Sequence, residues 1–173
     1  RMADSYGEAL GYSKLLETNK AEILLKKLIK KDPNEVIFQY ALGQCYIQQN
    51  KIKLALKQIK HTYTEHPYYY PVILAYGNAL IDAKKYQQAR SFLRKHLHEF
   101  KKRPDIYYAL AKAQARNGDQ AASHITQAKL YQLLQKPRAA KLQLEIALNN
   151  KKITPDERFQ AAAMLRRLEL NQE

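Results

Sequence analysis

Residues 41–46, Ala41-Leu42-Gly43-Gln44-Cys45-Tyr46, belong to a pattern that recurs at a fixed spacing of thirty-four residues. Stepping by this spacing takes Gly43 to Gly77 and Ala111, Ala55 to Ala89 and back to Ala21, Tyr46 back to Tyr12, and Pro67 back to Pro33. Such a period is typical of stacked repeats, in which each repeat buries its apolar face against the next one.

A spacing of thirty-four residues with leucine-glycine, tyrosine, alanine and proline at these offsets resembles the tetratricopeptide (TPR) repeat, a helix-turn-helix unit. The resemblance implies an all-α fold, a TPR-like right-handed helical solenoid of about ten helices. With the helix-ending proline at position 32, repeats begin near residues 2, 36, 70 and 104 of a single domain spanning 1–173.

The bulk composition agrees with a helical chain that has its own core. The chain has 173 residues, of which 46% are hydrophobic, so a core can form without metal or disulfide. Five glycines and six prolines are too few turn residues for an all-β fold. The one cysteine, Cys45, lies inside a predicted helix, where we expect a small buried thiol.

Small residues recur where the two helices of each repeat should cross. They are Ala9, Gly43, Gly77 and Ala111 on the first helices and Ala21, Ala55, Ala89 and Ser123 on the second. Facing small residues let paired helices approach to about 8–10 Å. The proline that ends the second helix of the third repeat, Pro104, lies three residues later than the period predicts. This delay predicts an extra part-turn at the end of that second helix.

The fourth and fifth repeats share one helix in this interpretation. Residues 121–131 fit a second helix with Ser123 at the small position, and equally a first helix with Ala128 and Tyr131 in the alanine and tyrosine slots. A half-shifted repeat therefore begins near residue 121. The capping box Thr154-Pro155-Asp156-Glu157 then predicts a terminal capping helix over 154–171.

These atypical features resemble one particular arrangement. Its marks are Tyr6-Gly7-Glu8-Ala9-Leu10, Gly118-Asp119-Gln120-Ala121-Ala122-Ser123-His124, the doubled helix and Leu165-Arg166-Arg167-Leu168. Together they resemble the C-terminal TPR domain of the BepA-type periplasmic zinc metalloproteases, which help assemble and police outer-membrane proteins in Gram-negative bacteria. The resemblance implies a periplasmic location and a zinc-binding protease domain before Arg1. Gln135-Lys136-Pro137 departs from it, because a glycine-containing turn is expected there.

The chain itself lacks the residues that such chemistry needs. His98-Glu99 is followed by Phe100, so no second histidine completes a His-Glu-x-x-His zinc helix. His96 and His98 are two residues apart and point to different sides of a helix. Glycine-rich phosphate loops and nucleophile-elbow serines are also missing. We therefore expect a non-catalytic chain with no metal or cofactor, any zinc belonging to the protease domain.

TPR solenoids bind partners along a concave face, and the resemblance carries its positions onto the first helix of each repeat. They are Tyr6, Leu10 and Lys14; Tyr40, Gln44 and Gln48; Leu74, Asn78 and Asp82; Tyr108, Lys112 and Arg116; and Ile125 and Lys129. Tyrosines there offer flat contact area, and amides offer hydrogen bonds to a peptide backbone. The alternative is that some of these tyrosines only pack between repeats.

A second candidate surface is basic. The net charge is +14, and Lys26, Lys60 and Arg94, joined by Lys27 and Lys95, recur on the outer face of the second helices. This stripe is either a solvated convex face or a docking face for an acidic protein, including the protease domain. In the loop Tyr68-Tyr69-Tyr70, at least one tyrosine should be exposed.

The predicted function is protein binding, with outer-membrane proteins or their assembly machinery as partners. A stand-alone TPR scaffold in pilus or secretion assembly is the alternative within the same class. A nucleic-acid-binding solenoid would use the +14 charge and the 13 tyrosines, but the tyrosines occupy repeat core slots. No apolar run reaches the length of a membrane span.

Overall fold

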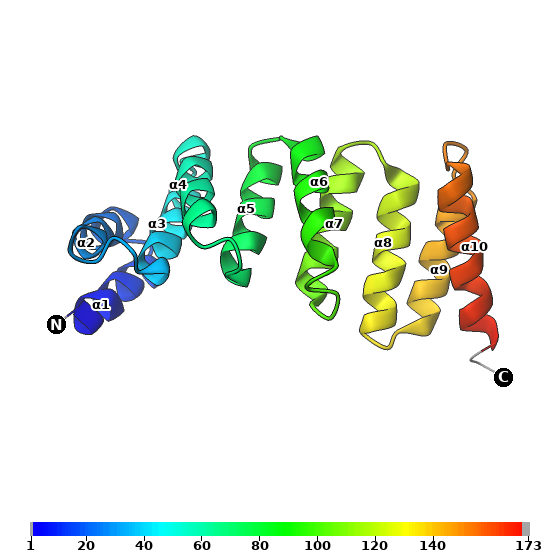
Figure 1. The fold of residues 1–173 in the computed structure, drawn as a ribbon, viewed down its shortest axis with the longest axis horizontal. Coiled ribbons are helices and arrows are strands. Elements are labelled where there is room, and N and C mark those ends of the chain that lie inside the picture. The colour runs from blue at the N-terminus through cyan, green and yellow to red at the C-terminus, as the bar shows by residue number, and fades with distance from the viewer. Residues whose placement is uncertain (1, 171–173) are drawn as a thin grey trace. The chain divides into compact units, whose positions relative to one another are not determined.

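A computed structural model describes residues 2–170, and all the regular structure in that range is helical. The helices are α1 (Met2–Lys14), α2 (Thr18–Lys31), α3 (Val36–Gln48), α4 (Ile52–Glu65), α5 (Tyr70–Asp82), α6 (Tyr86–Leu97), α7 (Pro104–Arg116), α8 (Gln120–Leu133), α9 (Pro137–Leu148) and α10 (Pro155–Leu170) (Figure 1). They form two compact units, α1 to α5 up to Lys84 and α6 to α10 from Lys85 onward. The single domain expected over 1–173 stays a prediction.

Proline ends the second helices of unit 1, as expected. The residues before Pro33 and Pro67 are Asp32 and His66, which have φ values of −137° and −130° and lie outside helical geometry. The ring of a proline clashes with the preceding residue when that residue is helical. The last helical residues are therefore Lys31 in α2 and Glu65 in α4. Consecutive helices then pack as neighbours, α1 on α2, α2 on α3, α3 on α4 and α4 on α5.

The predicted crossing residues are confirmed as interior positions. Ala9, Gly43, Gly77 and Ala111 are buried on the first helices, and Ala21, Ala55, Ala89 and Ser123 are buried on the second. Around them, Leu25, Leu42 and Tyr46 fill the core of unit 1. Cys45 is 1% exposed, its thiol donates to the Thr18 carbonyl at 3.2 Å, and burial raises its pKa. The expected buried thiol is therefore confirmed.

The turn inside each repeat requires a residue with positive φ. Leu16, Asn50, Lys84 and Gly118 stand thirty-four residues apart and have φ values of 61°, 55°, 59° and 91°. Only Gly118 avoids the steric cost of this left-handed conformation. Gln135 has the same left-handed geometry, with φ 55°. It lies in the turn where the BepA-type arrangement led us to expect a glycine.

In unit 2, α8 has neighbours on two sides. It packs against α7 and α9 and also contacts α10, which is the double role that its two registers predict. Ile125 and Ala128 join Ala140 and Leu144 in the core beneath α9. Ile125, which the concave pattern included, is thus buried at 2% exposure and is not a surface residue.

The capping box of α10 is present. The Thr154 amide donates to Glu157 Oε2 at 2.9 Å, and the Glu157 amide donates to Thr154 Oγ1 at 3.3 Å. Ala161 and Leu168 then bury one face of α10 against α8 and α9.

The extra part-turn predicted for the third repeat is wrong. α6 ends at Leu97, and the residues before Pro104 form turns, closed by the Phe100 amide on the His96 carbonyl at 3.3 Å. The additional residues lengthen the loop because they make turn hydrogen bonds rather than continuing the helix.

Candidate functional site

In unit 1 the concave-face tyrosines form part of an aromatic cluster. The rings of Tyr6 in α1 and Phe38 in α3 lie 5.3 Å apart between centroids, at an interplanar angle of 52°. Tyr40 is half-buried and packs against Ile59, Ala75 and Ala79. Its ring is therefore partly a packing element between repeats, as the alternative interpretation held for some of these tyrosines.

The hydroxyls of this cluster influence one another. Burial raises the pKa of Tyr6, and Tyr69, Tyr40 and Glu35 raise it further. Burial, followed by Tyr69, also raises the pKa of Tyr40. Tyr69 precedes α5 in the chain and was not among the concave positions, although the sequence marked its loop as a candidate. The hydroxyls of these three tyrosines can donate and accept hydrogen bonds at one surface of unit 1.

The other predicted positions of unit 1 differ in accessibility. Gln44, Leu74 and Asn78 are half-buried, and Asp82 is exposed. Their amide, apolar and acidic side chains come from α3 and α5. No hydrogen bond within residues 2–170 is found for the Gln44 or Asn78 side chain, so both amides are available to a ligand.

In unit 2 a groove of about 250 Å³ lies between α7 and α8. Its lining consists of Tyr108, Ala111, Lys112 and Ala115 from α7 and Ser123, Gln127, Leu130 and Tyr131 from α8. Tyr108 is 67% exposed and Lys112 is exposed, so both side chains present contact area to solvent. The structure thus brings two of the predicted concave residues into one groove.

Hydrogen bonds fix the floor of this α7–α8 groove. Ser123 Oγ donates to the Ala111 carbonyl at 2.9 Å, and Gln127 Nε2 donates to Ser123 Oγ at 3.2 Å. The Gln127 carbonyl oxygen stays available as an acceptor for a ligand. Gln127 and Tyr131 were not among the predicted concave positions, because the half-shifted register of α8 selected Ile125 and Lys129 instead and assigned Tyr131 to a repeat tyrosine slot. Their place in the groove follows from the pairing of α7 with α8.

Two further predicted positions in unit 2 lie outside this lining. Arg116 is exposed in the last turn of α7. Lys129 is half-buried, and burial followed by the charge of Arg94 lowers its pKa. Arg94 was assigned to the basic outer face, so Lys129 lies near a residue of that face.

The basic outer positions differ in their partners. Lys26 pairs with Glu22 at 2.6 Å and stands 5.9 Å from the centroid of the Tyr46 ring. Lys60, Arg94 and Lys95 are exposed. The charge of Lys26 is therefore largely compensated within unit 1, and the stripe is less uniform than its spacing predicts.

The remaining candidates give simpler outcomes. Tyr68 is 85% exposed, which confirms that at least one tyrosine of its loop faces solvent. Among residues 2–170 no three histidine, cysteine or acidic side chains are grouped so that they could hold a metal ion. Over the same range no helix combines the length and apolarity needed to cross a membrane.

Comparison with known proteins identifies the class of this fold. A family model described as anaphase-promoting complex, cyclosome, subunit 3 matches residues 15–96, a little under half of the chain. A comparison with curated protein sequences gives no match.

Solved structures align over nearly the whole chain. MamA from Desulfovibrio magneticus is 14% identical with a TM-score of 0.72, covering 99% of this chain and 95% of that one. A thermophilic TPR protein from Thermus thermophilus is 16% identical with a TM-score of 0.61, covering 96% and 100%. YrrB, described as a TPR protein with an unusual peptide-binding site, is 13% identical with a TM-score of 0.57, covering 94% and 90%.

At sequence identities this low, the likeness to these solved structures establishes the fold and nothing more. The chain has a TPR-like fold of stacked helical repeats. The matched names give no link to BepA-type metalloproteases, so that part of the expectation stays a prediction.

Proposed function

We propose that this chain binds an extended segment of another protein along the first helices of its repeats. The observation that carries the proposal is the α7–α8 groove, in which an exposed tyrosine, a lysine and a glutamine acceptor surround a small-residue floor. Tyr108 supplies rigid amphipathic area, and Gln127 supplies a hydrogen bond to a backbone amide. Lys112 favours a segment with a nearby carboxylate.

The tyrosine cluster of unit 1 supports the same mode of binding. Tyr6, Tyr40 and Tyr69 present hydroxyl groups, and the half-buried amides of Gln44 and Asn78 come from neighbouring first helices. Such surfaces hold main-chain groups with little dependence on sequence. This suits a module that accepts unfolded or partly assembled proteins.

The resemblance of the repeat pattern to BepA-type proteins supplies the context of the proposal. The module would act in the periplasm of a Gram-negative bacterium. It would hold outer-membrane proteins, or their assembly machinery, for a zinc protease domain in the same polypeptide. This chain would contribute binding and no hydrolysis. A stand-alone TPR scaffold in pilus or secretion assembly would use the same surfaces without the protease.

Binding can be tested with a labelled, urea-denatured outer-membrane β-barrel protein diluted into the purified chain. We expect Tyr108→Ala to weaken binding about fivefold to tenfold, because a central tyrosine contact is worth about 1 kcal/mol or more. Tyr68→Ala is the matched control, since Tyr68 is 85% exposed and outside the groove. Equal losses in the two variants would refute the groove assignment.

Photo-crosslinking locates the bound segment independently. A photoreactive residue placed at Tyr40, Asn78 or Lys112 should capture the β-barrel protein, and one placed at Lys60 or Arg94 should not. Capture only from Lys60 and Arg94 would replace the concave surface with the basic outer surface.

A further inference from the structure

A second groove, in unit 1, lies between α1 and α2 and has a volume of about 400 Å³. It is lined by Ser5, Leu24, Lys27, Leu28, Lys30 and Lys31. Ligand pockets typically occupy about 300–1,000 Å³, so this space admits bulky side chains. None of its lining residues belongs to the tyrosine cluster or to the α7–α8 groove.

Comparison between the repeats explains why the α1–α2 groove is open. The position of Ser5 is occupied by Gln39, Ile73 and Tyr107 in the three following repeats, and those larger side chains are buried. Gln39 Nε2 donates to the Pro33 carbonyl at 2.6 Å, and the Tyr107 hydroxyl donates to the Lys101 carbonyl at 2.9 Å. Serine is too small to fill the equivalent space in the first repeat.

Two lysines of the groove, Lys27 and Lys31, occur together only in the first repeat, because Lys27 has lysine counterparts at Lys95 and Lys129 but the counterparts of Lys31 are Glu65, Glu99 and Leu133. Lys27 and Lys31 correspond to His61 and Glu65 in the second repeat. Stacking of repeats therefore does not require two lysines at these positions. Within residues 2–170, Lys27, Lys30 and Lys31 have no ion-pair partner.

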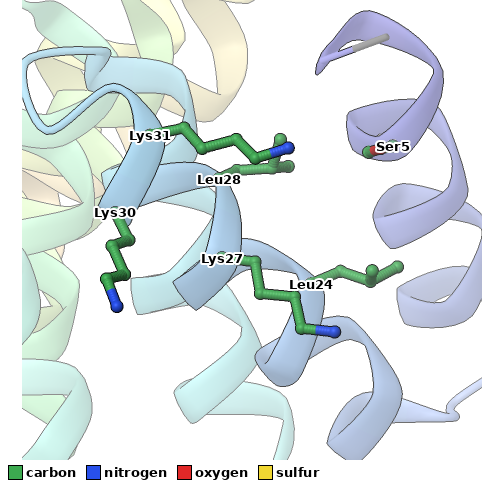
Figure 2. Close-up of a pocket in the computed structure, with 6 residues that line it drawn as sticks. All are labelled: Ser5, Leu24, Lys27, Leu28, Lys30 and Lys31. Atoms are coloured by element: carbon green, nitrogen blue, oxygen red, sulfur yellow. The ribbon is translucent and has the colours of Figure 1, made fainter.

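The groove combines an apolar floor with a cationic rim. Leu28 is 2% exposed and Leu24 is half-buried. Figure 2 shows Leu24, Lys27 and Lys31 extending from α2 toward α1, where Ser5 lies, whereas Lys30 points away from α1. Asp4 and Asp32 are neighbours of the groove in sequence, but neither lines it. An apolar ligand that carries carboxylates matches this arrangement in both shape and charge.

We propose that the α1–α2 groove docks an acidic amphipathic segment of a partner protein. A bulky apolar side chain enters between Ser5 and Leu24, and carboxylates next to it pair with Lys27 and Lys31. Exposed ion pairs alone are weak, so the apolar insertion provides affinity and the lysines provide orientation and charge selection. The site is independent of the proposed concave-face function, because the two use different residues.

The test uses a fluorescein-labelled synthetic peptide in which leucines and a phenylalanine recur at helical spacing among glutamates. Binding is measured by fluorescence anisotropy on the full chain at physiological ionic strength. Two control peptides replace either all glutamates by glutamine or all large apolar residues by serine. We expect each control peptide to bind at least about tenfold more weakly, because each removes one half of the match.

Two variants place the peptide on the protein. Ser5→Tyr copies Tyr107 and should fill the groove, and Lys27→Gln with Lys31→Gln removes the cationic rim; each should weaken binding about tenfold or more. Lys53→Gln with Lys57→Gln is the matched control, because it removes the same charge from exposed positions of α4 outside the groove. Far-UV circular dichroism and the urea midpoint verify that each variant is folded.

Three results would overturn the proposal. The first is equal weakening by the α2 and α4 lysine pairs, which would mean attraction to net charge alone. The second is unchanged binding in the folded Ser5→Tyr variant or in the α2 lysine variant. The third is binding to phosphatidylglycerol vesicles without binding to the peptide, which would assign the groove to a lipid surface.

Discussion

The crossing of α3 and α4 depends on the absence of a side chain at Gly43. A Cβ atom placed there would lie 2.5 Å from Ile59 Cγ1 and 3.2 Å from Ile59 Cδ1. Carbon atoms in favourable contact are about 3.5–4.0 Å apart, so the first distance is short by about 1 Å. Ile59 is 1% exposed and has no open side toward which it can move.

The expected cost of Gly43→Ala follows from this geometry. Inserting a methyl group into a packed interior costs about 1–3 kcal/mol, through displaced backbone or a strained rotamer. Alanine is the better helix former by about 0.5–1 kcal/mol, which offsets part of the cost. We therefore expect a net loss of about 0.5–2 kcal/mol in the free energy of unfolding.

Urea denaturation followed by far-UV circular dichroism measures this change, with the m-value checked for constancy. Gly7→Ala in α1 is the control, because a Cβ there meets nothing within 4 Å. It should stabilise the chain by about 0.5–1 kcal/mol through helix propensity alone. The first repeat suggests a rescue, since it pairs Ala9 with Leu25 at the positions of Gly43 and Ile59.

Leucine carries one γ carbon where isoleucine carries two, so its χ1 rotamer can change to leave room for the alanine methyl group. The double variant Gly43→Ala with Ile59→Leu should therefore recover most of the stability lost in Gly43→Ala, which gives a favourable coupling energy. If Gly43→Ala proved as stabilising as Gly7→Ala, the argument that this crossing requires glycine would be refuted.

Two other predictions concern stability. Leu16→Gly should stabilise the chain by about 0.5–1 kcal/mol in urea denaturation, because Leu16 is held at φ 61°, where glycine avoids the steric cost. Leu16 is 77% exposed, so little packing is lost, and Gly118 already occupies the same repeat position. A lower urea midpoint for the variant would contradict this. Glu22 has its pKa lowered from 4.5 to about 2, chiefly by the hydrogen bond from Lys26, with a further bond from Lys51. A folded-state pKa below the unfolded value stabilises the fold above pH 4.5, and this contribution disappears as the pH falls toward 2. Between pH 7 and pH 3 the free energy of unfolding of the wild type should thus fall by about 1–2 kcal/mol more than that of Glu22→Gln. Parallel curves of unfolding free energy against pH for the two proteins would contradict this.

Part of the site could be predicted because repeat position fixes which face of a helix a residue occupies. Tyr108 and Lys112 lie in the α7–α8 groove, and Tyr6 and Tyr40 belong to one cluster. Tyr69 joins that cluster from a different segment of the chain, so no spacing within a helix could have indicated it.

The sequence by itself determined the helical repeat, its starts at residues 2, 36, 70 and 104, and the burial of its small residues. These follow from local rules, namely the thirty-four-residue period, proline stops and the need for close helix approach. Only the tertiary structure decided the loop after α6, the compensation of Lys26 by Glu22, and the opening of the α1–α2 groove at Ser5. Each depends on which side chains from separate helices share a space, and periodicity places residues on faces without specifying their neighbours.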